Sequence, residues 1–201
     1  MVNSGRVLYT IGYSLHSLED FLEILQGYGI LAVVDVRSVP YSSFRPDFQY
    51  RKLKQNLPAR GMEYLFYGRE LGGRFEDPEV YVQGRADYER IARHEWFRQG
   101  LQRLRQKMDE QRLVLMCAER EPLNCHRAIL ISRCLRSEAR IFHILEDGSL
   151  EGHEHFEKRL LNRFAAQPCE LPVDEDLALS RLDQAYRLQG RKIAYKMKNK
   201  Q

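Results

Sequence analysis

Polar side chains gather where three apolar segments of the chain end. These segments are residues 7–12 (VLYTIG), 31–36 (LAVVDV) and 113–117 (LVLMC), and each is typical of a buried strand. The polar residues at or after their ends are Tyr13, Ser14 and His16, then Asp35 and Arg37, then Arg120, Cys125, His126 and Arg127. Ligands of open α/β sheets bind outside the carboxyl ends of the strands. We therefore expect these residues to surround one ligand-binding cleft.

Asp35 would be the orienting or acid/base carboxylate of this cleft. An isolated carboxylate is costly to bury in an apolar strand, so Asp35 must be hydrogen-bonded or ion-paired. Arg37 and Arg127 would hold an anion, Arg127 from the first turn of a helix whose free N–H groups attract negative charge. Arg127 is expected to face solvent, so that its loss would cost little stability. The alternative is a purely structural ion pair between Asp35 and Arg37.

Cys125 and His126 are candidates for a reactive pair, with His16 as a further candidate. A thiol at the start of a helix has a lowered pKa, which favours the nucleophilic thiolate. Alternatively, Asn124 caps this helix and Cys125 packs as a small apolar residue. Cys134 follows the apolar face of the same helix and is expected in the core.

A metal site is an alternative interpretation of the cysteines and histidines of the chain. The available ligands are Cys117, Cys125, His126, His16, His153 and His155. No pair of them has the C-x-x-C or H-E-x-x-H spacing, so we assign none of them as a metal ligand. The sequence leaves any cofactor unknown. A phosphatase or rhodanese loop is disfavoured, because a C-x5-R loop from Cys117 would need arginine where the chain has Leu123. The loop also has no glycine to let its N–H groups converge.

The segments that must position these residues alternate along the chain between short apolar runs, which are typical of strands, and amphipathic stretches, which are typical of helices. This alternation predicts an α/β fold: a single domain with a mostly parallel sheet and helices on both faces. Ser17 is expected to cap a first helix that ends at Gly27 and Gly29, so that the chain opens with a β-α-β unit and a parallel pair of strands. Further helices are predicted over residues 50–57, 88–108, 126–135 and 155–164, and further strands over 62–67 and 141–145.

Bulk composition fits an ordinary globular protein. The chain has 201 residues, of which 43% are hydrophobic and 30% charged. It has no signal-peptide pattern and no run approaching the roughly 20 apolar residues of a membrane-spanning helix. We therefore expect a cytoplasmic protein with no membrane partner. Its 4 cysteines are irregularly spaced and are expected to be reduced; Cys169 is expected to be incidental.

Positive charge is concentrated in two parts of the chain. The last twelve residues, from Gly190, hold five Lys/Arg and no acid, whereas the net charge of the whole chain is +4. We predict a domain over residues 1–170 and an extension over 171–201 that ends in this flexible basic tail. Residues 36–74 hold eight Lys/Arg, three acids and seven aromatics. This mixture favours stacking on bases and holding phosphates, although an aromatic-rich loop can also be a lid packed on its own core.

Four motifs, in this order, resemble the family called domain of unknown function 488. They are TIGYSLH (10–16), VDVR (34–37) with Pro40, LGG (71–73) and CAEREPLNCHR (117–127), and the similarity spans about residues 7–165. The resemblance implies a compact α/β domain and supplies no reaction. The residues themselves favour binding of an anionic ligand, a nucleotide or nucleic acid, with catalysis left open. The alternatives are a metal- or thiol-dependent enzyme and a non-catalytic regulatory or interaction module.

Overall fold

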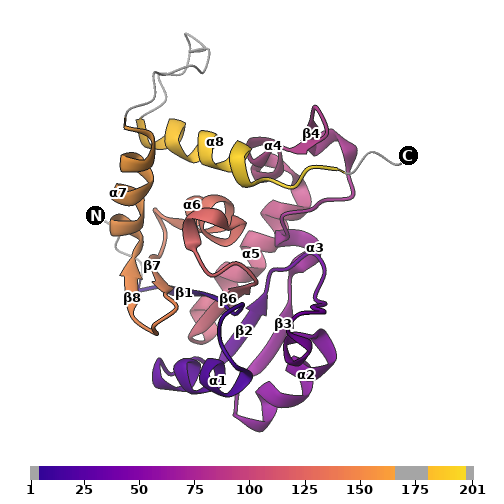
Figure 1. Cartoon of the computed structure of the whole chain (residues 1–201), viewed down its shortest axis with the longest axis vertical. Helices are drawn as coiled ribbons and strands as arrows, with labels where there is room; N and C mark the ends of the chain where they lie inside the picture. The colour runs from indigo at the N-terminus through magenta and orange to yellow at the C-terminus, as the bar shows by residue number, and fades with distance from the viewer. Residues whose placement is uncertain (1–4, 166–180, 198–201) are drawn as a thin grey trace.

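A six-stranded sheet in the order β3-β2-β6-β1-β7-β8 runs through the centre of the molecule (Figure 1). The computed structural model describes residues 5–165 and 181–197. The strands are β1 (Val7–Gly12), β2 (Ala32–Asp35), β3 (Glu63–Phe66), β6 (Leu113–Cys117), β7 (Arg140–Ile144) and β8 (Leu150–Gly152). Neighbouring strands are parallel except β7 and β8, which are antiparallel. The predicted α/β class with a mostly parallel sheet is confirmed.

Helices cover both faces of this sheet (Figure 1). One face packs against α1 (Leu18–Gly27) and α2 (Tyr50–Ala59). The core on the other side contains α4 (Tyr88–Arg93), α5 (Glu95–Glu110), a π-helix (Arg127–Ser132), α6 (Arg133–Leu135), α7 (His153–Phe164) and α8 (Arg181–Ile193). In this layer α8 packs on α4, α7 and the π-helix. The short elements are α3 (Gly68–Leu71), a hairpin of β4 (Tyr81–Val82) and β5 (Arg85–Ala86), and 3-10 turns at Pro46–Phe48, Pro78–Val80 and Pro122–Asn124.

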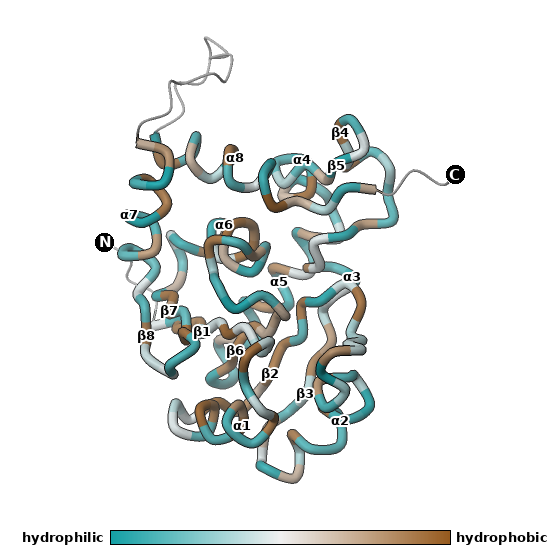
Figure 2. Tube along the Cα trace, viewed as in Figure 1, coloured by the Kyte–Doolittle hydropathy of each residue, from teal (hydrophilic) through white to brown (hydrophobic). Residues whose placement is uncertain are grey.

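Strand residues alternate between the two cores. Val33 packs with α1 and α2, whereas Val34 packs on the opposite face, as the two-residue period of a strand requires. Figure 2 shows hydrophobic residues along the central strands, where both faces are covered. No helix within the described residues is both long and apolar enough to cross a bilayer.

β6 lies between β1 and β2. The prediction that the first two strands pair with each other is therefore wrong: each is parallel to β6 instead. The connection from β1 leads toward the β2 side of the sheet, and the connection from β6 leads across β1 to β7. Adjacent strands whose connections leave in opposite directions form a crevice at their carboxyl ends, which is where α/β sheets bind ligands.

The start of α1 agrees with the prediction from the sequence, whereas the predicted helix over residues 88–108 does not. The Ser17 side chain accepts a hydrogen bond from the Asp20 N–H at 3.1 Å, so Ser17 caps α1 as predicted. The single helix predicted over residues 88–108 is instead two helices, α4 and α5, separated at His94. His94 has an extended backbone, and its ring accepts from the Trp96 N–H at 3.3 Å, so this side chain starts a new helix.

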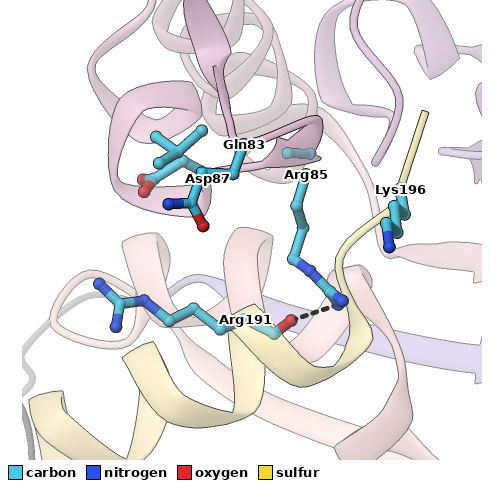
Figure 3. A pocket seen from close by; sticks show the side chains of 7 residues that line it. Gln83, Arg85, Asp87, Arg191 and Lys196 are labelled. Atoms are coloured by element: carbon cyan, nitrogen blue, oxygen red, sulfur yellow. Dashed lines mark hydrogen bonds between the residues drawn. The ribbon is translucent and has the colours of Figure 1, made fainter. Parts of the chain in front are cut away.

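The C-terminal segment is packed on the domain as far as residue 197. Figure 3 shows Arg85 pointing from the hairpin toward α8, where it donates to the Arg191 carbonyl at 2.7 Å. The Tyr195 carbonyl accepts from the Ala86 N–H at 2.9 Å, and Ala194 is buried in the core. The prediction of a flexible appendage from Gly190 is therefore wrong for residues 190–197. Residues 198–201, Cys169 and the predicted boundary at 170/171 lie outside the described residues.

A chain of buried polar groups joins β1, β7, α7 and α8. The Thr10 hydroxyl lies 2.8 Å from His143 Nδ1, and His143 Nε2 lies 2.9 Å from His153 Nδ1. His153 Nε2 lies 2.9 Å from the Tyr186 hydroxyl, which donates to Glu157. Burial lowers the pKa of His153 to about 3, and burial also lowers the pKa of His143 well below its ordinary value. Both rings are therefore neutral at neutral pH.

These histidines should make the protein acid-sensitive. The unfolded chain takes up a proton at each ring below about pH 6.5, whereas folded His153 resists until about pH 3. The free energy of unfolding should therefore fall with decreasing pH below 6.5, by up to about 1.4 kcal/mol per pH unit for each histidine. Urea unfolding between pH 7 and pH 4 measures this slope. A His153→Asn variant should have a shallower slope, and an unchanged slope would contradict the assignment.

Candidate functional site

A cleft of about 460 Å³ opens beside the carboxyl ends of β1 and β6. Its lining comes from the loops after β1 and β2, from the end of β6 and the loop after it, from residues 73–74 and Tyr88, and from the end of α8 and the segment after it. The lining residues are Tyr13, Arg37, Ser38, Val39, Tyr41, Gly73, Arg74, Tyr88, Cys117, Ala118, Glu119, Asn124, His126, Ile193 and Tyr195. Four of the candidate residues from the sequence line this cleft: Tyr13, Arg37, His126 and the candidate metal ligand Cys117.

Asp35 and Arg37 form a closed, buried ion pair next to the cleft. Arg37 Nε and Nη2 donate to the two Asp35 oxygens at 2.9 and 2.6 Å, and Nη1 donates to the Tyr13 hydroxyl at 3.0 Å. The Tyr64 hydroxyl also donates to Asp35, at 2.7 Å. Burial opposes the charge of Arg37, but the hydrogen bonds and charge of Asp35 outweigh it and raise the guanidinium pKa. The positive charge of Arg37 is thus balanced within the protein.

Arg127 is fully buried, so the expectation that it faces solvent is wrong. Its Nη2 donates to the Arg120 carbonyl at 3.0 Å, its Nη1 donates to the Glu119 carbonyl, and its Nε lies 3.4 Å from the Thr10 hydroxyl. The guanidinium therefore holds the loop after β6 onto β1. Gly12 permits this approach, because a Cβ there would lie 1.9 Å from the Glu119 carbonyl oxygen.

Two cysteines and a histidine meet at the wall of the cleft. Cys117 ends β6, and Cys125 and His126 immediately precede the π-helix. His126 Nδ1 lies 3.8 Å from the Cys117 sulfur and 3.9 Å from the Cys125 sulfur, and its Nε2 lies 3.0 Å from the Val36 carbonyl oxygen. Both thiols donate toward Glu119 Oε2, at 3.0 and 3.4 Å. This cluster contains the two residues predicted as a reactive pair.

The two thiols respond differently to their surroundings. Interaction with Cys125, together with burial, raises the pKa of Cys117 well above its ordinary value. Burial opposes ionisation of Cys125 too, but Cys117 and the charge of Arg127 outweigh it and lower the Cys125 pKa. The pKa of His126 is raised, because interaction with Cys125 outweighs burial. A negative charge on the pair therefore resides on Cys125, beside a ring that favours its protonated form.

The other candidate residues lie away from the cleft lining. His16 is 6% exposed, and burial lowers its pKa. The main-chain carbonyl of Ser14 accepts a hydrogen bond from Arg45 Nε at 3.0 Å. Arg120 is 62% exposed at its side chain and lies 3.6 Å from a Glu146 oxygen, facing a separate surface hollow.

The lining residues that were not identified from the sequence include Glu119, Arg74, Tyr88 and Tyr195. Glu119 lies between the two cysteines of one sequence motif, and this proximity is a signal that could have identified it. Tyr88 and Tyr195 reach the cleft from elements far away in the chain, so only the tertiary structure brings them there.

The family model described as domain of unknown function DUF488 matches residues 17–134. This span includes β2, β6 and both cysteines of the cluster. The chain belongs to this family. The resemblance predicted from the motifs is thereby confirmed, over a shorter span than the predicted 7–165. Comparison with curated proteins and with solved structures found no match.

The LGG motif in the matched span has a packing role beside the cluster. A Cβ on Gly73 would lie 3.3 Å from the His126 ring, and a Cβ on Gly72 would lie 2.3 Å from the Gly68 carbonyl oxygen. A larger residue at position 73 would therefore press on the imidazole. This contact explains why a glycine-rich motif far from the cysteines in sequence belongs to the same site.

Proposed function

We propose that this protein binds a small anionic molecule, of the nucleotide class, in the cleft at the carboxyl ends of its central strands. The observation that supports the proposal most strongly is the position of Arg74. It is an exposed cation in the cleft lining, and its guanidinium lies 4.6 Å from the centre of the Tyr195 ring. Among the described residues no carboxylate forms an ion pair with it. The ring holds this guanidinium in place, and its hydrogen-bond donors are available to an anion.

The shape and chemistry of the lining support a nucleotide. A volume of about 460 Å³ falls within the range of ligand pockets, roughly 300–1,000 Å³. Tyr41, which is 64% exposed, and the half-buried Tyr195 offer aromatic rings with polar tips, which suit a base. Arg37 is neutralised by Asp35, and Glu119 lies beside the cysteines. The phosphate is therefore expected at Arg74.

Thermal unfolding with a panel of nucleoside mono-, di- and triphosphates tests this proposal. A nucleotide present at about 100 times its Kd should stabilise the protein by about 2.7 kcal/mol, which is roughly 5–10 °C for a chain of this size. Inorganic phosphate alone should have a smaller effect, because it makes no contact with the tyrosines.

The Arg74→Ala variant should bind the same nucleotide roughly tenfold more weakly, since a charge-assisted hydrogen bond is lost. Arg69→Ala is the matched control: Arg69 is an exposed arginine on α3, five residues earlier, outside the cleft lining. Equal weakening in the two variants would indicate non-specific charge attraction. That result, or the absence of stabilisation by every nucleotide, would overturn the proposal.

A further inference from the structure

We propose that Cys117, Cys125 and His126 bind a zinc ion at the wall of the cleft. Their two sulfurs and one ring nitrogen all lie within 4.8 Å of one another, which is the arrangement of a three-ligand metal site. This inference goes beyond ligand binding in the cleft and is independent of it, since metal binding can be measured on the protein alone.

The spacing of the donor atoms matches tetrahedral zinc. Zn–S and Zn–N bonds of about 2.3 and 2.0–2.1 Å, at tetrahedral angles, separate a sulfur from a nitrogen ligand by roughly 3.6 Å. The His126 Nδ1 atom lies 3.8 Å from one sulfur and 3.9 Å from the other. Both sulfur–nitrogen separations are therefore within a few tenths of an ångström of those in a zinc site.

The ring of His126 is already oriented for a metal. Its Nε2 lies 3.0 Å from the Val36 carbonyl oxygen, which can only accept a hydrogen bond. Nε2 must then carry the proton, so that in the neutral ring the lone pair of Nδ1 faces the two sulfurs. Ligating histidines commonly use such a carbonyl to fix the ring and its tautomer.

The surrounding charges suit a dication. Two thiolates and the nearby Glu119 carboxylate carry three negative charges, and Arg127, which bonds to the loop at Glu119, carries one positive charge. An ion of charge +2 brings this group to neutrality, and two thiolates with one imidazole select a soft or borderline metal such as zinc.

The ligands lie on rigid elements, and the ion would face the cleft. Cys117 is the last residue of a central strand, and Cys125 and His126 are held by the start of the π-helix, where the Ala128 and Ile129 N–H groups donate to the Cys125 carbonyl. Cys117 and His126 line the cleft. Three protein ligands leave a fourth position open to a water or a bound molecule, as in catalytic zinc sites.

Metal analysis of the full-length protein, purified without chelator, tests the site. We expect one zinc ion per chain, with all 4 cysteines reduced after unfolding. After removal of zinc, added Co²⁺ should give the visible bands of a tetrahedral ion and the near-ultraviolet absorption of thiolate ligands. These measurements use the unsubstituted protein, so they decide the question even where a variant fails to fold.

Single substitutions identify the ligands. Cys117→Ser, Cys125→Ser and His126→Gln should each weaken zinc binding at least tenfold, while Cys134→Ser, at a half-buried cysteine outside the cluster, should leave it unchanged. Absence of zinc combined with absence of cobalt–thiolate absorption would overturn the proposal. So would a Cys117–Cys125 disulfide in the native protein, or equal loss of zinc in Cys134→Ser.

Discussion

Replacing Arg127 with methionine should lower the free energy of unfolding by about 3 kcal/mol. The side chain is fully buried, and its guanidinium donates to the carbonyls of Glu119 and Arg120. Methionine fills similar space but donates nothing, so two carbonyl groups lose their partners. An unsatisfied buried acceptor costs about 1–3 kcal/mol. This expectation reverses the one drawn from the sequence, in which Arg127 was a solvent-facing residue whose loss would cost little stability.

Urea unfolding followed by far-ultraviolet circular dichroism measures this difference. Arg120→Met is the matched control, because Arg120 belongs to the same loop but has a largely exposed side chain. Its effect should remain within about 0.5 kcal/mol. If the two variants unfold at the same urea concentration, the hydrogen bonds of Arg127 do not hold the loop after β6 in place.

Replacing Asp35 with asparagine should destabilise the protein by about 3–5 kcal/mol. Asparagine has nearly the same shape, but the Arg37 guanidinium, 5% exposed, would then lack a counter-charge. The Tyr64 hydroxyl would also lose its charged acceptor. Breaking one side of a buried pair costs far more than the net contribution of the pair, since an uncompensated charge remains in the interior.

A double-mutant cycle separates this charge effect from simple loss of packing. Asp35→Asn combined with Arg37→Met leaves no unpaired charge, so the double variant should be less destabilised than the sum of the two single variants. The coupling energy, measured by urea unfolding, should be at least about 1 kcal/mol. Strictly additive effects would show that the two side chains act independently, contrary to the bidentate contact between them.

Local patterns in the sequence determined the class of the fold and the edge at which the site lies. The apolar runs ending at Gly12, Val36 and Cys117 predicted three buried strands, and parallel strands place their carboxyl ends at one edge of a sheet. Cys125 and His126 were selected because they lie at the predicted start of a helix, and in the structure they immediately precede the π-helix. These inferences depended only on neighbours in the chain, and they correspond to what the structure contains.

The order of the strands was decided by pairing between distant segments. More than 70 residues of the chain lie between β2 and β6. In the sheet, however, β6 lies between β1 and β2, because its apolar residues are buried on both faces there. A β-α-β pattern cannot reveal whether a later strand will enter between its two strands. Cys117 and His126 are only nine residues apart and meet through the loop after β6, but their spacing matches no short metal motif.

The sequence contains only a weak indication that α8 packs on the domain. Ala185, Tyr186, Gln189 and Gly190 are buried and follow a helical period, but only Tyr186 among them is large and apolar. The concentration of lysine and arginine near the C-terminus made a solvated tail the simpler interpretation.

The directions of the arginine side chains could not be derived from the sequence. Arg37, Arg74 and Arg127 have the same chemistry, yet one is neutralised by a carboxylate, one lies exposed in the cleft, and one is buried against carbonyls. Sequence determines which residues carry charge; the backbone around each guanidinium, assembled from distant parts of the chain, decides which charge remains available to a ligand.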